Sequence, residues 1–151
     1  MSSKGYIDLY SFKSKYNMEI RAMIEEGLLY TKQHEWAKVE GNIVTVGITD
    51  YAQMLLGEII FVELPDVGTE VIYDHEMTVV ESTKAANDIF APVTGKIVSV
   101  NSALESEPEL INKDCYNAGW ICKIEMTSDA SLELLLNAEQ YKQYVKDSEQ
   151  Q

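Results

Sequence analysis

Short apolar runs separated by polar turns extend from Leu28 towards the C-terminus, a pattern typical of a mainly β protein. The runs are rich in Val and Ile, and Glu40-Gly41-Asn42 supplies a turn between the first two. The candidate strands are Glu35–Val39, Ile43–Ile48, Ile59–Leu64, Thr78–Glu81, Ile89–Ala91, Lys96–Val100 and Trp120–Met126. The sequence therefore predicts a fold built mainly from short strands.

Two regions outside these strands carry helix signals. The first is a short helix over residues 51–56, which we expect Asp50 to cap and Gly57 to end. The second lies near the C-terminus, where we expect Ser131 to cap a stretch that Asn137 interrupts before helix resumes. Its apolar positions are Leu132, Leu135, Leu136, Tyr141, Tyr144 and Val145. These are short peripheral helices and a C-terminal helix.

One short sequence pattern occurs twice in the β region. Residues 57–62 and 95–100 share the pattern Gly-charged-Ile-aliphatic-x-Val, 38 positions apart. The echo is either chance or a sign of two similar β halves that face each other, with the segment around Lys84 in the connection between them. The glycines would then mark places where the chain bends between sheets.

Residues 1–27 precede the β pattern and do not share it. The apolar residues of Met18–Glu26 have the spacing of a helix, and Gly27 could end that helix. An organelle presequence, a remnant of the expression vector and a genuine extension all remain open, because the segment has serines and lysines but also Asp8 and no arginine before residue 18. We therefore expect an N-terminal extension over 1–27, one domain over 28–146 and a polar tail over 147–151.

Composition restricts the classes of function. The chain has 151 residues, 46% of them hydrophobic, which suits one globular domain. Its 25 acidic and 12 basic residues give a net charge of −13, which disfavours nucleic acid and anionic lipid as partners. The acidity suits positively charged docking partners, or it only confers solubility. No apolar stretch approaches the roughly 20 residues of a membrane helix, and no signal peptide is visible.

The cysteines and histidines form no recognisable catalytic or metal-binding motif. Cys115 and Cys122 are expected to be reduced thiols, with Cys122 in the core and Cys115 exposed in a polar loop. We expect His34 to orient a local loop beside Trp36, and His75 to be a solvated turn residue. The sequence also lacks a nucleophile elbow and a phosphate-binding glycine loop. Catalysis by the unaided chain is therefore not predicted, and no metal site is expected.

Lys84 is the candidate functional residue because of its surroundings. It lies in the small, polar segment Glu81-Ser82-Thr83-Lys84-Ala85-Ala86-Asn87-Asp88, which separates two apolar β runs. This pattern predicts a hairpin with a lysine at its tip and unobstructed access from Ala85 and Ala86. Such a lysine is ordinarily a solvated charge. An exposed amine on a flexible stem also suits covalent acylation, and residue spacing alone leaves both interpretations open.

A set of ordered motifs resembles the glycine cleavage system H protein family. The segment around Lys84, with Asp88-Ile89-Phe90-Ala91-Pro92 and Gly95, resembles the lipoyl-lysine segment of that family. The resemblance runs from about Leu28 to about Tyr144. The other matching motifs are Tyr30-Thr31-Lys32-Gln33-His34-Glu35-Trp36, residues 46–53, Val62-Glu63-Leu64-Pro65, Pro108-Glu109-Leu110-Ile111-Asn112 and Gly119-Trp120.

The resemblance implies a fold, a cofactor and a set of partners. The fold would be a lipoyl/biotinyl-type barrel-sandwich hybrid of two quasi-symmetric sheets. Lys84 would hold lipoate in amide linkage, so the chain would be a non-catalytic carrier of an aminomethyl group and reducing equivalents. Its partners would be glycine decarboxylase (P protein), aminomethyltransferase (T protein), dihydrolipoamide dehydrogenase (L protein), and a lipoate ligase or octanoyltransferase. A monomer is expected, cytoplasmic in a bacterium or archaeon and in the mitochondrial matrix of a eukaryote.

The resemblance also implies roles for residues near the hairpin. Glu35 and Asp88 would face the ammonium of the loaded arm in a dry cleft, with Ile48 as an apolar wall. Gln33 stands where some relatives have a small hydroxyl residue, so a contact from that position is not expected. Glu81 and Asp88 flank the tip and would set the register of a ligase on the folded hairpin. Alternatively, Glu35 is only a strand residue and Asp88 only solvates the hairpin.

Other functions remain open from the sequence. The chain could be an H-like lipoyl carrier of sulfur metabolism or of a lipoate relay. A 2-oxoacid dehydrogenase domain usually presents Asp-Lys-Ala, whereas this chain has Thr83-Lys84-Ala85. A biotin carrier usually has methionines beside its lysine. An interaction module with an unmodified Lys84 is the remaining alternative.

Overall fold

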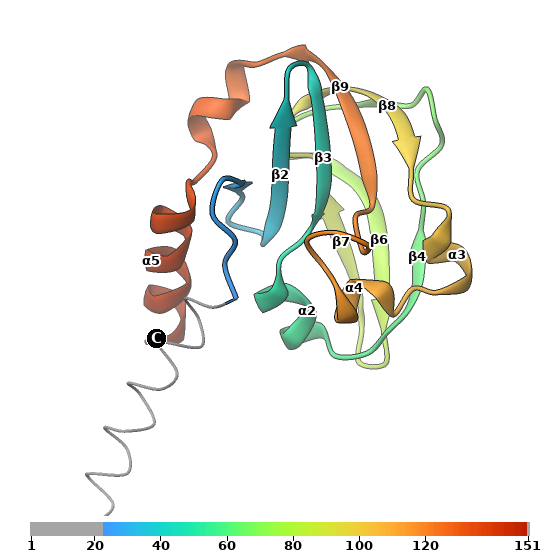
Figure 1. Cartoon of the computed structure of the whole chain (residues 1–151), viewed down its shortest axis with the longest axis vertical. Coiled ribbons are helices and arrows are strands. Elements are labelled where there is room, and N and C mark those ends of the chain that lie inside the picture. Colours follow the sequence, from blue (N-terminus) through green and yellow to red (C-terminus); the bar gives the residue numbers. More distant parts are fainter. Residues whose placement is uncertain (1–22, 151) are drawn as a thin grey trace, which may run out of the picture.

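The computed structural model describes residues 23–150, which form nine strands in two antiparallel sheets (Figure 1). One sheet has six strands in the order β1-β2-β3-β9-β8-β5, and the other has three in the order β4-β6-β7. The strands are β1 (Leu29–Tyr30), β2 (Glu35–Glu40), β3 (Ile43–Ile48), β4 (Ile59–Glu63), β5 (Glu70–Val71), β6 (Glu76–Ser82), β7 (Ala86–Phe90), β8 (Thr94–Val100) and β9 (Cys122–Ser128). The predicted mainly β architecture is confirmed.

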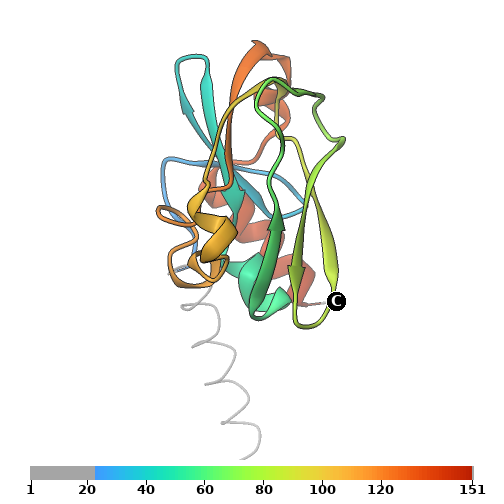
Figure 2. The ribbon, with the colours of Figure 1, turned by 90° about the vertical axis from the view of Figure 1, so that its right-hand side faces the viewer.

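The main core lies between the two sheets. Buried side chains of the six-stranded sheet, such as Val44 and Ile124, belong to the same apolar cluster as Val62, Val80 and Ile89 of the three-stranded sheet. Buried and more exposed residues alternate along much of β6 and β8, whereas Val44–Ile48 of β3 are all buried. Figure 2 shows the three-stranded sheet on one side of the molecule and β2 and β3 on the other.

The helices are short except for the last one. They are α2 (Asp50–Leu56), α3 (Ala103–Ser106), α4 (Leu110–Lys113), the 3₁₀ helix η1 (Ala130–Leu134) and α5 (Ala138–Glu149). No helix among the described residues is long and apolar enough to cross a membrane.

The helix caps differ from two predictions. Thr49, and not Asp50, caps α2: the Thr49 hydroxyl accepts a hydrogen bond from the Ala52 amide at 3.1 Å. Ser131 lies inside η1 and is buried, where its hydroxyl donates to the Pro92 carbonyl at 3.0 Å. Asn137 interrupts the helical stretch as predicted, and it does so by forming a capping box with Gln140 at the start of α5.

A second apolar cluster attaches α5 to the side of the six-stranded sheet (Figure 1). Tyr141 of α5 stacks on Tyr30 of β1 with ring centroids 4.5 Å apart. Trp36 and Val145 are buried in the same cluster. The helix continues to Glu149, so residues 147–149 of the expected polar tail are helical.

Three further sequence expectations are resolved by the structure. The two echoed segments fall in β4 and β8, which belong to different sheets. Cys115 is buried, contrary to the prediction, because its loop folds over Trp36, whose indole N–H donates to the Cys115 carbonyl at 3.0 Å. The predicted helix over 18–26 falls partly outside the described residues, and residues 23–26 are turn and loop.

Candidate functional site

The β6–β7 hairpin presents Lys84 at its tip, as the sequence predicts. Ser82 closes the turn: its amide donates to the Ala85 carbonyl at 2.8 Å, and its hydroxyl accepts from the amides of Lys84 and Ala85 at 3.1 and 3.2 Å. Ser82 is buried, whereas Thr83, Lys84 and Ala85 are exposed. The turn is therefore fixed from within by one hydroxyl, and the lysine is left on the surface.

The tip is supported by the loop between α2 and β4, at the same end of the molecule (Figures 1 and 2). The Thr83 amide donates to the Glu58 carbonyl at 3.0 Å. The aliphatic stem of Lys84 crosses Gly57, since a Cβ added at Gly57 would lie 3.4 Å from Lys84 Cε. Gly57 has a φ of 83°, which is a conformation that favours glycine. The loop between α2 and β4 thus passes beneath the Lys84 side chain at Gly57, which has no side chain of its own.

Asn112 of α4 holds this supporting loop in place. Its Oδ1 accepts from the Ile59 amide at 2.9 Å, and its Nδ2 donates to the Gly57 carbonyl at 2.8 Å and to Gln53 Oε1 at 2.9 Å. One side chain therefore connects α2, the loop and β4. Sequence reasoning assigned Asn112 no role, although it ends one of the matching motifs.

Among the described lysines, Lys84 combines an exposed hairpin tip with small neighbours. Lys32 also lies in a turn between paired strands, but its amine lies 5.9 Å from the centroid of the Tyr144 ring. Lys142 forms an ion pair with Glu26, and Lys123 lies over the Trp120 ring. The Lys84 amine has no such partner in the part of the chain that the structure describes. This environment fits a lysine that is acylated by another protein.

Glu35 is a buried carboxyl group at the start of β2, with 0% of its surface exposed. The Thr31 hydroxyl donates to its Oε1 at 2.5 Å, and the Phe90 amide of β7 donates to its Oε2 at 3.2 Å. Burial raises the pKa of Glu35 to about 7, and these two hydrogen bonds oppose the rise. The carboxyl thus connects the turn before β2 with the strand that follows Lys84.

The other predicted cleft residues lie around Glu35 at different depths. Ile48 is the cross-strand partner of Glu35 and is buried beside it. Asp88 is exposed on β7, two residues before the Phe90 amide that Glu35 binds. Glu35 and Ile48 are therefore adjacent, whereas Asp88 reaches the surface on the connecting strand. Gln33 turns away to Asp74, to which its Nε2 donates at 3.2 Å.

Two hollows border the region of Glu35. One, of about 280 Å³, is lined by Thr31, Gln33 and Asp74 among others. The other, of about 460 Å³, is more open and is lined by Asp74, His75, Glu76 and Phe90. Thr31 and Phe90 both donate hydrogen bonds to the Glu35 carboxyl. Thr31 lines the first hollow, and Phe90 lines the second.

Glu81 is exposed on β6, opposite Ala86. Its carboxylate lies on the same hairpin as Lys84, three residues before it. Glu81 and Asp88 are thus on opposite strands of the hairpin, as expected from the sequence.

The histidines and cysteines have structural positions. His34 has a φ of 72°, and its carbonyl accepts from the Thr49 amide at 3.0 Å, so it shapes the turn before β2 as predicted. His75 is exposed in a bend. Burial raises the pKa of both Cys115 and Cys122 to about 12, which leaves them as thiols. Within residues 23–150, no group of three or more His, Cys, Asp or Glu side chains could hold a metal ion.

Comparisons with known proteins agree with this geometry. The chain matches the family described as glycine cleavage H-protein over residues 28–148. It is 49% identical over 126 residues to a glycine cleavage system H protein of Symbiobacterium thermophilum, a match that covers 83% of this chain and 98% of the relative. It is 52% identical over 118 residues to one from Alkaliphilus oremlandii, covering 78% and 92%.

A solved structure extends the likeness to three dimensions. The crystal structure of a glycine cleavage system H protein from Mycobacterium marinum matches with a TM-score of 0.72 and 36% sequence identity. The match covers 83% of this chain and 98% of that one. The likeness to this family therefore extends from the sequence to the fold.

Proposed function

The chain belongs to the glycine cleavage H-protein family, and from this membership we propose that Lys84 is its lipoyl attachment site. Proteins of this family carry a covalent lipoate on a lysine and act as carriers in glycine cleavage. The observation that supports Lys84 is its place at the exposed tip of the β6–β7 hairpin, which Ser82 closes and Glu58 supports. When attached, the lipoyl dithiolane supplies thiol–disulfide exchange chemistry.

The experiment is an intact-mass measurement of the whole chain after coexpression with a lipoate ligase. The parent protein should gain a single lipoyl increment, and Lys84→Ala should gain none. Lys113→Ala, which removes an exposed lysine of α4, is the matched control and should be lipoylated as the parent is. A lipoyl group on Lys32, Lys96 or Lys113 would contradict the proposal. Because Lys84 is exposed, its replacement should change the free energy of unfolding by about half a kcal/mol or less.

Glu81 is proposed to help the ligase recognise the folded hairpin. It is exposed, and the folded hairpin holds it at a fixed place relative to Lys84. In the same assay Glu81→Lys should slow lipoylation, while Glu125→Lys on β9 should not. Equal rates for Glu81→Lys and the parent would exclude Glu81 as a determinant.

The chain is proposed to have no catalytic activity of its own and to visit three enzymes in turn. Family membership implies interaction with the other components of the glycine cleavage system. We propose that these are the decarboxylase, the aminomethyltransferase and dihydrolipoamide dehydrogenase, with the carrier as a monomer. The relatives compared above are bacterial, which favours a cytoplasmic location.

Glu35 is proposed to bind the ammonium of the cargo, with Ile48 as an apolar wall and Asp88 as a second, exposed carboxylate. A carboxyl with a pKa of about 7 can ionise when a cation arrives, because the cation offsets the cost of burying the charge. The ammonium must displace one of the groups that cover Glu35, and both of these groups border a hollow. The carboxylate would then hold the amine away from water.

Ammonia release from the loaded protein, without the transferase, tests this role. Glu35→Gln should release ammonia at least about tenfold faster than the parent, since a charge-assisted hydrogen bond contributes about 1.5–3 kcal/mol. Gln is preferable to Ala because it can still pair with Thr31 and with the Phe90 amide. Glu40→Gln, an exposed change on the same strand, is the control. Equal rates for Glu35→Gln and the parent would contradict the role and leave the attachment site at Lys84 intact.

A further inference from the structure

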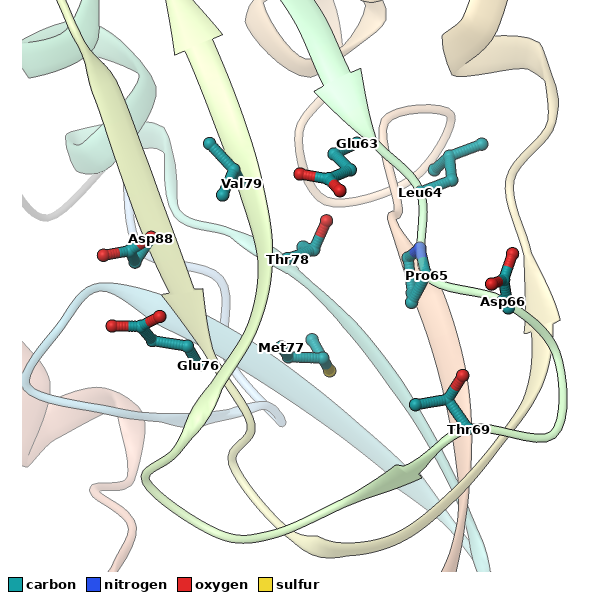
Figure 3. A pocket seen from close by; sticks show the side chains of 10 residues that line it. All are labelled: Glu63, Leu64, Pro65, Asp66, Thr69, Glu76, Met77, Thr78, Val79 and Asp88. Atoms are coloured by element: carbon teal, nitrogen blue, oxygen red, sulfur yellow. The ribbon is translucent and has the colours of Figure 1, made fainter.

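An open groove lies beyond the end of β4, between β6 and the segment that follows Glu63 (Figure 3). β4 ends at Glu63, and the chain then leaves the sheet through Leu64, Pro65 and Asp66. The pairing of β6 with β7 is irregular between Glu76 and Thr78. The groove between these segments has a volume of about 320 Å³. We call it the acidic groove.

The charge of the acidic groove is entirely negative. Glu63, Asp66, Glu76 and Asp88 line it, and no lysine, arginine or histidine does. The ion pair between Lys142 and Glu26 is the only one in the described part of the chain, so none of these four carboxylates has a cationic partner there. Four uncompensated carboxylates around one hollow attract a cation, but residues 23–150 offer no cluster suited to a metal ion.

Thr78 gives the acidic groove an unsatisfied polar group at its base. Its side chain is 6% exposed, and its hydroxyl is the one buried side-chain polar atom without a hydrogen-bond partner among the described residues. Figure 3 shows this hydroxyl directed towards Glu63 across the groove. Leaving such a group unpaired destabilises a protein, and a donor placed in the groove would satisfy it.

We propose that the acidic groove binds a Lys or Arg side chain of a partner protein. The N–H groups of the cation would reach the Thr78 hydroxyl, while Glu63 and Glu76 would balance its charge. The groove opens on the hairpin that carries Lys84. Thr78 and Ser82 are four positions apart along β6, roughly 13 Å of extended chain. A protein anchored at the groove can therefore reach Lys84.

This proposal rests on the proposed carrier function, because it assigns the docking surface to the enzymes that act at Lys84. The groove does not contain Lys84, so docking there depends on the protein surface and not on the attached group. The net charge of −13 supports a basic partner surface, which such charge attracts from a distance.

The test measures the affinity of the whole lipoylated chain for purified decarboxylase, aminomethyltransferase and dihydrolipoamide dehydrogenase by calorimetry at low salt. The double variant Glu63→Gln/Glu76→Gln should bind at least one of these enzymes roughly tenfold more weakly. The matched control Glu125→Gln/Glu139→Gln removes two exposed carboxylates outside the groove and should stay within about twofold of the parent. High salt should reduce the difference between the parent and the groove variant.

Thr78→Val separates docking from a general effect of charge. Valine matches threonine in shape and removes a buried hydroxyl that has no partner, so the free energy of unfolding should stay the same or rise. Binding to the enzyme that the double variant affects should fall about fivefold. The proposal would be overturned if the groove double variant bound all three enzymes as tightly as the parent does. It would also be overturned if the control double variant lost as much affinity as the groove double variant.

The same samples distinguish this failure from failure of the proposed function. Intact mass reports whether Lys84 is lipoylated, independently of binding. Loss of affinity in the groove variants with an unmodified Lys84 would support the groove and refute the attachment site. A lipoylated Lys84 with unchanged affinities in the groove variants would support the attachment site and refute the groove.

Discussion

Glu35 shows how one buried residue makes the molecule sensitive to pH. Its carboxyl has no exposed surface, and burial raises its pKa from 4.5 to about 7. In the unfolded chain the group ionises at its ordinary, lower pKa. Between these two values the unfolded state is charged while the folded state keeps its proton, so the folded state is favoured less as pH rises.

We therefore predict that Glu35 destabilises the fold progressively between about pH 4.5 and pH 7. Its contribution is fully favourable below the unfolded pKa and is lost as pH rises through the folded pKa. The cost should reach on the order of 3 kcal/mol above pH 7. Glu35→Gln cannot ionise, so its stability relative to the parent should increase with pH over this range. Urea unfolding at several pH values measures the difference.

A control on the same strand isolates the effect of burial. Glu40 is exposed at the other end of β2, and Glu40→Gln should follow the parent at every pH. Parallel curves for Glu35→Gln and the parent would show that the buried carboxyl does not hold its proton in the folded state.

At the scale of elements, the loop between α2 and β4 depends on one side chain from α4. Asn112 supplies an acceptor for the Ile59 amide and a donor for the Gly57 carbonyl and for Gln53. The Gly57–Glu58 segment in turn supports the hairpin tip through Thr83. The position of Lys84 therefore depends on a residue 28 positions further along the chain.

Asn112→Ala should lower the free energy of unfolding by about 1–3 kcal/mol, because it leaves partly buried backbone groups without partners. Urea unfolding measures this loss. Asn117→Ala is the matched control: Asn117 is exposed and takes part through its backbone alone. A loss no larger than that of Asn117→Ala would show that water replaces the Asn112 side chain without cost.

The elements that could be predicted from the sequence are those with a local signal. β3 was predicted with the same bounds as observed, and Gly57 ends α2 as predicted, with a φ of 83° in the structure. β1 and β5 were missed because two residues are too few to show a period. The cap of α2 was placed one residue late, since Thr49 and Asp50 are both capping residue types and only geometry separates them.

The candidate site was predictable where it is local in sequence and not where it depends on tertiary contacts. The hairpin and Lys84 follow from one continuous segment, which contains its own turn residue, Ser82. The bridge made by Asn112 joins segments more than 50 positions apart, and no sequence pattern indicates it. Cys115 was predicted to be exposed because its neighbours are polar, but the loop is folded over Trp36.

At the scale of the whole molecule, Tyr141 connects the C-terminal helix to the sheet that carries Glu35. Its hydroxyl lies 2.8 Å from His34 Nδ1 and 2.8 Å from the Thr49 hydroxyl, which also caps α2. Its ring stacks on Tyr30. One residue of α5 thus contacts the turn before β2, the start of α2 and β1.

Tyr141→Phe should therefore lower the free energy of unfolding of the whole chain, and not only loosen α5. Phenylalanine keeps the stacked ring and removes the hydroxyl, so His34 and Thr49 each lose a hydrogen-bond partner in a buried or partly buried place, at a cost of about 1–3 kcal/mol.

Tyr144→Phe is the matched control. Tyr144 is also in α5 and its ring also lies near His34, but its hydroxyl forms no hydrogen bond in residues 23–150. Urea unfolding followed by far-ultraviolet circular dichroism and by tryptophan fluorescence should give one shifted transition for Tyr141→Phe with both probes. Separate transitions for helix and core would mean that α5 is attached to the sheets as an independent unit, and an effect equal to that of Tyr144→Phe would mean that the hydroxyl contributes nothing to the attachment.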